Sequence, residues 1–277
     1  MQIYKDMSIG TAKPTKEEMQ GIVHHMIDVV SPSEVFSCAD YKTMAQKILT
    51  SVYGRGMIPI FCGGTGLYLD SVISGNPFSS PASDEKIKNS LIEELNEKGI
   101  DHLHKRLTEI DPESAEKIHK NNVKRVIRAL EIYLVSGKTK TEWDLESKNF
   151  ESDYHTVIIG LDYKDRDILY SRCDKRVDIM IEEGLEAEVR ALYDKGLICD
   201  LTTAGQAIGY KEFVPYFEKK INLDDVIESI KLNTRHYVKR QLTWFKRYEN
   251  INWVYPDIEK DFESLTDTCL EIINSHL

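Results

Sequence analysis

Apolar residues recur every three or four positions between Ser37 and Tyr53, which predicts an amphipathic helix. Ser37 can cap this helix, because a serine hydroxyl accepts a hydrogen bond from a free backbone amide of the first turn. Gly54-Arg55-Gly56 follows and is expected to end the helix. The apolar positions that define its face are Tyr41, Met44, Ile48 and Val52.

The next stretch, residues 57–75, has a different pattern. It reads MIPIFCGGTGLYLDSVISG, which is a short apolar run, a glycine-rich turn and a helical pattern. A short apolar run bounded by glycines is typical of a buried strand. The order helix, buried strand, glycine turn and helix predicts an α/β fold with a parallel sheet.

The pattern changes again after Gly75. Residues 76–84, NPFSSPASD, contain two prolines and three serines and are expected to form a linker. Residues 85–135 show several short amphipathic helices and no convincing strand. We therefore predict a helical insertion over residues 76–150.

Strand character returns in HTVIIGL, residues 155–161. From Arg166 onward the pattern is helical, and it ends in a long amphipathic helix over residues 223–247. The insertion therefore interrupts one α/β body, which we expect to comprise residues 1–75 and 151–277.

Length and composition agree with a main body that carries an insertion. The 277 residues are 41% hydrophobic, which is enough for a real core. The net charge of −10 argues against a nucleic-acid-binding coat, but it does not exclude a local basic site. Five cysteines without CxxC spacing indicate reduced thiols, and the histidines lack the spacing of metal ligands. With no signal peptide and no long apolar run, we expect a cytoplasmic protein that does not span a membrane.

A glycine-rich turn and a pair of arginines could each bind an anion. Gly63-Gly64-Thr65-Gly66 lies between a predicted strand and a predicted helix, where backbone N–H groups and the helix dipole favour an anion. A tight turn that needs glycine for steric reasons explains the same residues equally well. Arg172 and Arg176 are one helical turn apart and can point at one ligand, although Asp174 and Asp178 offer internal ion pairs instead.

Two further segments are strongly basic. KRVIR, residues 124–128, places Lys124 and Arg128 on one helical face, which a solvated surface also explains. RHYVKRQLTWFKR, residues 235–247, carries five Lys or Arg residues, three of the large aromatic residues and no carboxylate. Burying such charges without anionic partners is costly, so phosphate binding competes here with a plain surface helix.

Other catalytic signatures are missing from the sequence. Gly137-Lys138-Thr139 looks like the end of a phosphate loop, but Ile132 stands where that loop needs glycine and no strand precedes it. We therefore predict a helix C-cap and turn at Gly137. The chain contains no GxxxxGK[ST] motif, no catalytic-triad signature and no metal-ligand cluster.

Eight blocks of sequence nevertheless follow one another in the order found in a known family. The chain resembles the MiaA-type tRNA dimethylallyltransferases, which are tRNA prenyltransferases of the IPP transferase family, over essentially its whole length. The blocks are MQIYKDMSIGTAKPT, HHMIDVVSP, FSCADY, PIFCGGTGLYLDSVISG, KRVIRALEIY, GLEAEV, AIGYKE and TRHYVKRQLTWFKR.

The resemblance implies a P-loop NTPase-like parallel-sheet core with a helical insertion domain, which binds tRNA, and a helical C-terminal part. Family members begin with a strand, a phosphate loop and a helix, and then an Asp-Ser-Met-Gln stretch, of which Met1 and Gln2 stand here. We therefore expect the family's first strand, phosphate loop and catalytic aspartate to be absent from this chain. On that expectation the chain has little transferase activity but still binds tRNA weakly.

The family's reaction transfers a dimethylallyl group from dimethylallyl diphosphate to N6 of adenosine 37, beside the tRNA anticodon. Diphosphate leaves readily only if its developing charge is neutralised, which calls for Mg²⁺, backbone N–H donors and arginines. We expect Mg²⁺ to be held mainly by the substrate diphosphate and the absent N-terminal segment. The site must exclude water, and an adenine of the anticodon loop can be flipped into a closed channel at modest cost.

The resemblance also implies roles for individual residues. Thr65 and Arg176 are the expected catalytic residues, and Arg172, Arg176 and Gly64 are expected to bind the diphosphate. Arg240 and Gln241 are expected to face the channel. The expected tRNA-binding residues are Met1, Gln2, Thr65, Lys88, Lys124, Arg125, Val126, Ile127, Arg128, Gln206, Ala207, Ile208, Gly209, Tyr210, Lys211, Arg240 and Gln241.

Other functions share part of this pattern. An adenylate dimethylallyltransferase, which makes cytokinins from a nucleotide, shares the core but needs no insertion that grips RNA. A non-catalytic tRNA-binding remnant is a second alternative. A nucleotide kinase shares the α/β style but not the C-terminal blocks. The partners we expect are a tRNA anticodon stem-loop and dimethylallyl diphosphate, bound by a monomer.

Overall fold

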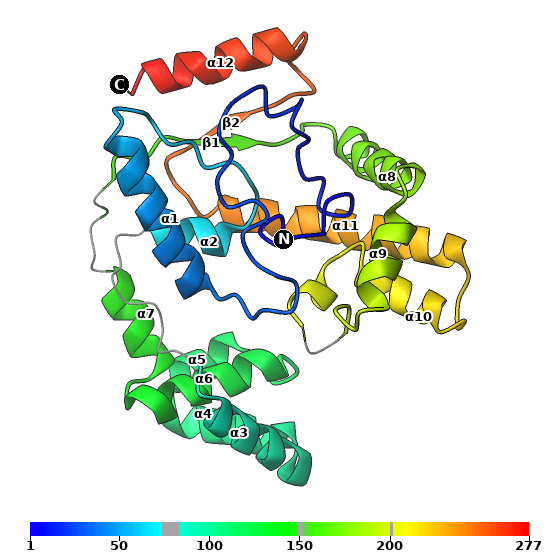
Figure 1. Ribbon diagram of the computed structural model, residues 1–277. Coiled ribbons are helices and arrows are strands. Elements are labelled where there is room, and N and C mark those ends of the chain that lie inside the picture. Colours follow the sequence, from blue (N-terminus) through cyan, green and yellow to red (C-terminus); the bar gives the residue numbers. More distant parts are fainter. Residues whose placement is uncertain (74–82, 149–151, 153, 200–201, 277) are drawn as a thin grey trace. The chain divides into compact units, whose positions relative to one another are not determined.

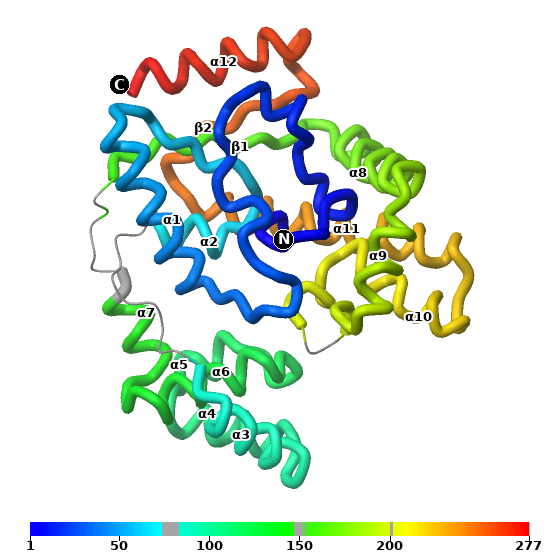
Figure 2. Tube along the Cα trace, viewed as in Figure 1, coloured from blue at the N-terminus to red at the C-terminus, as the bar shows by residue number. Residues whose placement is uncertain are grey.

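The computed structural model describes residues 1–73, 83–148, 152, 154–199 and 202–276 (Figures 1 and 2). The chain forms two compact units. The core unit comprises Met1–Leu69 and Thr156–Leu277, and the helical unit comprises Asp70–His155. The predicted insertion, residues 76–150, falls within the helical unit.

The core unit consists mainly of helices. Helix α1 (Cys38–Tyr53) begins as predicted, because the Ser37 hydroxyl accepts the Asp40 backbone N–H while the Asp40 carboxylate accepts that of Ser37. Gly54 caps its C-terminal end, so both predicted boundaries are confirmed. The other helices are α2 (Gly66–Ile73), which begins in this unit, α8 (Arg166–Glu182), α9 (Leu185–Tyr193), α10 (Val214–Phe217), α11 (Leu223–Phe245) and α12 (Phe262–Asn274), with 3-10 turns at Ala204–Gln206 and Lys211–Phe213.

The sheet of the core unit consists of two parallel strands, β1 (Ile158–Leu161) and β2 (Ile251–Val254). Strand β1 lies within the predicted segment 155–161, whereas β2 and α12 were not predicted. Gly160 stands opposite Trp253, and a Cβ on Gly160 would lie 2.8 Å from the indole ring. The missing side chain therefore lets the Trp253 indole pack directly on the backbone of β1.

The predicted buried strand at residues 57–62 is wrong. The structure has no strand there, and Ile58 and Ile60 are 68% and 84% exposed. A strand needs a neighbour that takes up its backbone N–H and C=O groups. Pro59 has no N–H, and no strand of the described chain pairs with this segment. Apolar composition is therefore not sufficient to make these residues a strand.

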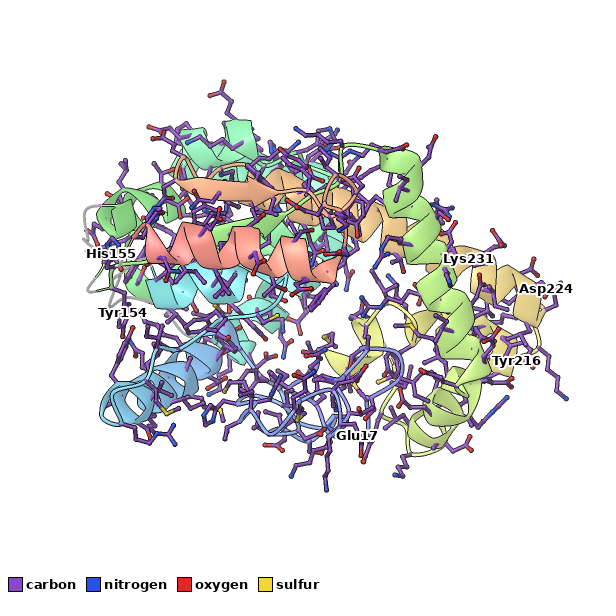
Figure 3. The ribbon with its side chains drawn as sticks, turned by 90° about the horizontal axis from the view of Figure 1, so that it is seen from above. Glu17, Tyr154, His155, Tyr216, Asp224 and Lys231 are labelled. Atoms are coloured by element: carbon purple, nitrogen blue, oxygen red, sulfur yellow. The ribbon has the colours of Figure 1, made fainter. Side chains whose placement is uncertain are left out.

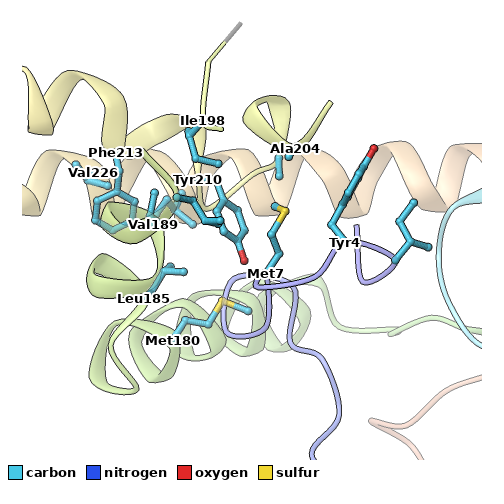
Figure 4. Close-up of a cluster of buried hydrophobic side chains, with 14 of the residues drawn as sticks. Tyr4, Met7, Met180, Leu185, Val189, Ile198, Ala204, Tyr210, Phe213 and Val226 are labelled. Carbon is cyan, nitrogen blue, oxygen red and sulfur yellow. The ribbon is translucent and has the colours of Figure 1, made fainter. Parts of the chain in front are cut away.

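The hydrophobic core of the core unit joins the N-terminal segment to α9 and the residues after it (Figure 4). Met7, Leu185, Tyr210 and Phe213 are fully buried, and Figure 4 shows the Met7 side chain beside the Tyr210 ring. A Cβ on Gly10 would lie 2.5 Å from that ring. Glycine is therefore required where the N-terminal segment crosses Tyr210.

Helices α8 and α11 pack antiparallel through regularly spaced charged pairs. Lys231 of α11, labelled in Figure 3, bonds Asp178 of α8 at 2.7 Å. One turn further along, Arg235 bonds Asp174 at 2.6 Å. Because the residue numbers rise along α11 as they fall along α8, the two helices run in opposite directions. Part of the charge on α11 is therefore neutralised within the protein.

The helical unit has no strand among its described residues, as predicted. Leu91, Leu103, Leu107 and Leu130 form its core. Gly137 directly follows the helix Val123–Ser136. It adopts the left-handed conformation, which confirms the predicted C-cap. The predicted linker, residues 76–84, lies largely outside the described residues. The helices are α3 (Glu85–Lys98), α4 (Ile100–Ile110), α5 (Pro112–Lys117), α6 (Val123–Ser136) and α7 (Lys140–Lys148).

All five cysteines have free thiols, in agreement with the prediction. Among the helices of the described ranges, none combines the length and the apolar composition needed to cross a membrane.

Candidate functional site

The glycine turn opens α2, as its sequence predicts. Gly63 has a φ of 150°, and the Thr65 carbonyl accepts the backbone N–H groups of Tyr68 and Leu69, which starts the helix. Thr65 itself is exposed. Its side chain therefore lies at the surface of the core unit, where a ligand can reach it, whereas Gly66, the first residue of α2, is buried.

Helix α11 packs directly on this turn. The Gln241 side-chain amide donates to the Gly64 carbonyl oxygen at 3.0 Å. A Cβ on Gly64 would lie 1.8 Å from the Gln241 amide nitrogen, and a Cβ on Gly66 would lie 2.1 Å from the Trp244 indole. Both glycines are needed so that α11 can approach this closely, which supports the steric explanation of the turn and leaves anion binding open.

Trp244 is one of the aromatic residues of the basic segment 235–247, and the sequence patterns assigned it no individual role. Its indole N–H is buried and has no hydrogen-bond partner within the described chain. The Arg247 guanidinium lies over the indole ring at 4.0 Å. A cation and an unused donor therefore flank the first residue of α2.

An aromatic cluster lies behind the turn. Tyr68 of α2 stacks on Tyr41 of α1 with ring centroids 4.2 Å apart, and Phe36 meets Tyr68 edge-on. Burial, with smaller contributions from Tyr4, Cys38 and nearby acidic groups, raises the pKa of Tyr68 to about 12. Tyr68 is therefore a neutral packing residue at neutral pH rather than a base.

Arg172 and Arg176 lie on an exposed face of α8. The carboxylates that could have paired with them are bonded to α11 instead, since Asp174 binds Arg235 and Asp178 binds Lys231. Neither Arg172 nor Arg176 forms an ion pair with any residue that the structure describes. The two arginines are therefore free to bind an external anion.

Arg172 and the glycine turn are related only through a series of intermediate residues of the core unit. The Arg172 guanidinium lies 5.9 Å from the centre of the Tyr163 ring. Tyr163 and Lys246 line one cavity of about 220 Å³. Lys246 follows α11, whose Trp244 lies against Gly66. This cavity and another of about 400 Å³ in the helical unit are not lined by Thr65, Arg172 or Arg176, so the closed channel stays a prediction.

The N-terminal residues assigned to tRNA binding also hold the local fold. The Gln2 side-chain amide donates to the carbonyl oxygens of Thr11 and Ala12, at 3.1 and 2.9 Å. Met1 is 38% exposed. A contact between Gln2 and RNA would therefore use the oxygen of its amide or its backbone.

Glu188 of α9 organises the N-terminal turn, and the sequence patterns missed it. Its carboxylate accepts the backbone N–H groups of Ser8, Ile9 and Gly10 at 2.9 to 3.2 Å. It also accepts the Tyr210 hydroxyl at 2.6 Å. Four donors converge on one carboxylate, which ties the segment at Ser8 to the segment around Tyr210. Glu188 falls inside the GLEAEV block, but no local periodicity indicates its partners.

The QAIGYK segment, residues 206–211, divides into an exposed and a buried part. Gln206 and Lys211 are exposed and can meet a ligand. Ala207 and Tyr210 are 5% and 0% exposed, so their side chains belong to the core. Gly209 is also buried and Ile208 is half-buried.

The basic segment of α6 divides in the same way. Lys124 and Arg125 are exposed, while Val126 and Ile127 are 0% and 9% exposed. Arg128 is half-buried and bonds the buried Glu131 carboxylate at 2.7 Å. The exposed cations of this segment can meet a polyanion, whereas Val126 and Ile127 can offer only backbone atoms.

Two remaining predicted residues lie on helices. Lys88 of α3 bonds Glu85 at 3.1 Å, a surface pair of little energetic weight, so its charge remains available. Arg240 of α11 is exposed, with its guanidinium 5.6 Å from the Tyr237 ring. Arg240 directly precedes Gln241 in the chain, and Gln241 contacts the glycine turn.

The described residues do not form a metal site on their own. No group of three or more His, Cys, Asp or Glu side chains within them is arranged to hold an ion. A metal bound here would take most of its ligands from a phosphate-bearing substrate and water, as Mg²⁺ commonly does.

Comparison with known proteins identifies the family. The model of the IPP transferase family matches residues 2–248. The tRNA dimethylallyltransferase of Thermoanaerobacter sp. is 43% identical over 278 residues, which span all of this chain and 88% of that relative. Because the family match starts at residue 2, it gives no support to the expectation that the family's phosphate loop is missing, nor to the low transferase activity expected on that ground.

Solved structures agree with the family match. The tRNA isopentenylpyrophosphate transferase of Staphylococcus epidermidis is 39% identical, with a TM-score of 0.69, and the match covers 100% of this chain and 89% of that one. A eukaryotic dimethylallyltransferase acting on tRNA has a TM-score of 0.80 at 29% identity, over 99% of this chain and 71% of that one. The chain belongs to the IPP transferase family.

Proposed function

We propose that this protein is a tRNA dimethylallyltransferase, which transfers a dimethylallyl group from dimethylallyl diphosphate to N6 of adenosine 37 in tRNA. Relatives that cover the whole chain carry this name, and one structural neighbour is described as acting on tRNA. The observation that carries the proposal is the packing of the basic C-terminal part of α11 on the glycine turn through Gln241 and Gly64. It joins an RNA-attracting surface to the predicted reaction centre at Thr65.

The proposed reaction is an alkyl transfer. The adenine N6 attacks C1 of the dimethylallyl group, the C–O bond to diphosphate breaks with its electron pair, and the N6 proton passes to a base. Charge develops on the leaving diphosphate, and the unpaired cations Arg172 and Arg176 are suited to neutralise it. A preorganised donor of this kind contributes roughly 2.7–4 kcal/mol of barrier lowering.

We propose that tRNA binds to exposed cations of both units. The exposed Lys124 and Arg125, with the half-buried Lys88, serve the helical unit, while the exposed Lys211 and Arg240 serve the core unit. Their charges are solvent-accessible, as binding through released counterions requires. The parallel pair β1 and β2 is the described part of the P-loop NTPase-like sheet that we propose for the core unit.

Mg²⁺ is proposed only as a companion of the diphosphate. When bound it would neutralise phosphate charge, but the described residues do not fit a metal held by protein ligands alone. The side chains that act on the substrates are therefore assigned without it.

The test is prenyl transfer to an anticodon stem-loop RNA by the wild-type protein and three variants. Arg176→Gln and Arg172→Gln remove the proposed diphosphate cations, and Arg55→Gln removes a matched exposed arginine beyond α1. We expect kcat to fall by about 10²–10³ for Arg176→Gln, with unchanged thermal stability. Arg55→Gln should match the wild type.

Two results contradict the proposal. One is an Arg176→Gln variant with the kcat of Arg55→Gln, which removes the role of the α8 arginines. The other is transfer to free AMP at least as fast as to the stem-loop RNA. That result favours the adenylate dimethylallyltransferase alternative instead.

A further inference from the structure

Two side chains of α11 contact the glycine turn on either side of Thr65. Gln241 and Trp244 are three residues apart, so they lie on one face of the helix. Gln241 contacts Gly64, and Trp244 contacts Gly66. Thr65, the expected reaction centre, is therefore the residue between the two contacts.

This contact, and not the backbone conformation, explains the two glycines. Gly63 has a positive φ of 150°, which favours glycine, but Gly64 and Gly66 have no positive φ. A Cβ on Gly64 would lie 1.8 Å from the Gln241 side-chain nitrogen, and a Cβ on Gly66 would lie 2.1 Å from the Trp244 indole. A larger residue at either position would therefore displace the side chain that contacts it.

Hydrogen bonds hold the backbone around Thr65. The Gly64 carbonyl oxygen accepts the Gln241 side-chain amide at 3.0 Å. The Thr65 carbonyl oxygen accepts the backbone N–H groups of Tyr68 and Leu69 at 3.0 and 3.3 Å. The Thr65 side chain, by contrast, is exposed. The turn thus presents this side chain from a backbone that α11 and the first turn of α2 both fix.

The Trp244 ring acts on the turn through packing rather than through a hydrogen bond. Its indole N–H is buried and has no partner among the residues that the structure describes. The Arg247 guanidinium lies 4.0 Å from the centre of the ring, and its Nε donates to the Trp244 carbonyl oxygen at 3.0 Å. Arg247 is therefore engaged with Trp244 and supports the ring that packs on Gly66.

We propose that Gln241 and Trp244 are positioning residues for prenyl transfer, which hold the backbone at Gly64 and Gly66 so that Thr65 stays at the reaction centre. The inference rests on the proposed function, because the role of Thr65 belongs to it. A displacement of about 1 Å at a reaction centre lowers the rate by about 10²-fold. Loosening either contact should therefore lower kcat, while the affinity for RNA stays the same.

A direct RNA contact is the competing role for Gln241, because the C-terminal part of α11 is basic and the neighbouring Arg240 is exposed. The hydrogen bond to Gly64 favours positioning, since it directs the Gln241 amide to the turn. The two roles differ in their kinetics. Loss of an RNA contact raises Kd and KM, whereas loss of a positioning contact lowers kcat.

The test compares kcat, KM and Kd for an anticodon stem-loop RNA. Gln241→Met keeps the length of the side chain and removes the amide donor, and Gln46→Met makes the same change at an exposed position of α1 as the control. We expect kcat to fall by about 10- to 100-fold for Gln241→Met, with Kd from fluorescence anisotropy unchanged. Gln46→Met should match the wild type in all three constants. Thermal melts identify a temperature at which every variant is folded.

Two variants of Trp244 separate packing from hydrogen bonding. Trp244→Phe keeps an aromatic ring against Gly66 and removes the N–H, whereas Trp244→Ala removes both. Because the indole N–H has no partner within the described ranges, Trp244→Phe should retain most of the wild-type kcat. Trp244→Ala should lose about as much kcat as Gln241→Met. A Trp244→Phe variant as slow as Trp244→Ala assigns the effect to the N–H and overturns positioning by packing.

A Gln241→Met variant that keeps the wild-type kcat but binds RNA more weakly also overturns the inference, because Gln241 is then an RNA contact. The proposed function fails on a different result. A wild-type protein that prenylates the RNA, with kcat unchanged in Gln241→Met and Trp244→Ala, sinks this inference alone. A wild-type protein that does not prenylate the RNA sinks the proposed function.

Discussion

The Glu188 carboxylate offers the sharpest stability prediction. It accepts four hydrogen bonds, three from the backbone N–H groups of Ser8, Ile9 and Gly10 and one from the Tyr210 hydroxyl. Hydrogen bonds to a charged group contribute about 1.5–3 kcal/mol each, against about 0.5–1.5 for neutral pairs. The substitution Glu188→Gln removes the charge and points an amide N–H₂ group at donors. We expect the free energy of unfolding to fall by about 2–4 kcal/mol.

Tyr210→Phe is the matched control, because it removes one of the four hydrogen bonds and keeps the buried ring. Its expected cost is about 1.5 kcal/mol, the lower end of the range for one bond to a charged group. For a domain of this size, 1 kcal/mol corresponds to about 2–4 °C in Tm. Glu188→Gln should therefore lower Tm by about 4–16 °C, and Tyr210→Phe by about 3–6 °C.

Thermal and urea unfolding followed by circular dichroism measure both differences. The urea series also shows whether the slope of unfolding free energy against denaturant is unchanged, which licenses the comparison. A Glu188→Gln variant whose Tm equals that of Tyr210→Phe would refute the convergence of four donors on this carboxylate.

Three further predictions concern single side chains. Gly66→Ala places a methyl group 2.1 Å from the Trp244 indole, so it should destabilise the protein by about 1–3 kcal/mol and shift its tryptophan fluorescence. Gly54→Ala is the control, because Gly54 has a φ of −61° and the nearest neighbour of the added methyl group lies at 3.2 Å. Its stability should stay within about 0.5 kcal/mol of the wild-type value. Asp162→Asn should cost about 1–3 kcal/mol at pH 7, because Arg166 loses its partner. Because the pKa of Asp162 is lowered, its contribution to stability is present above the ordinary pKa of 3.8 and is lost as the pH falls through the folded-state pKa. The urea melts of wild type and Asp162→Asn should therefore converge below that pH. A constant difference down to the acid limit would contradict the assignment. Glu131→Gln weakens the hydrogen bonds that the Glu131 carboxylate accepts from Ser83, Asp84 and Arg128. Hydrogen exchange should therefore accelerate in α3 and α6, while α8 keeps its protection. Equal acceleration in both units would be inconsistent with a local role.

Local sequence patterns predicted several elements for identifiable physical reasons. The capping residue Ser37 and the glycines after Tyr53 defined α1, and Gly137 defined the end of α6. These features act through neighbouring backbone groups, so a local pattern contains them. The strand predicted from the apolar run at Ile58 and Ile60 is wrong, because a strand depends on a partner far away in the sequence.

The same distinction applies to the site. Helical spacing predicts that Arg172 and Arg176 lie on one face of a helix. The ion pair between Asp174 and Arg235, however, depends on how α8 packs on α11. Before that packing is known, an internal salt bridge and a free cation are equally consistent with the sequence. Glu188 is a similar case, since its donors lie far from it along the chain. The GLEAEV block contains Glu188 without giving its contacts, and Arg172 and Arg176 lie outside the eight blocks.

Buried residues within predicted binding segments need a separate interpretation. Val126, Ile127 and Tyr210 lie in segments assigned to tRNA, yet their side chains are in the cores of their units. Each segment must present exposed cations such as Lys124 and Lys211 at fixed positions, and buried neighbours fix them. The segment is then the functional element, while only some of its side chains can meet RNA.

The central claim is that this chain prenylates an adenine held in an RNA loop. The most direct measurement is incubation of the protein with dimethylallyl diphosphate, Mg²⁺ and two stem-loop RNAs that differ only in adenosine or guanosine at position 37, followed by mass spectrometry of the nucleosides. The account predicts N6-dimethylallyladenosine from the adenosine RNA and no prenylated nucleoside from the guanosine RNA. An unmodified adenosine RNA under conditions where a relative modifies it would contradict the account.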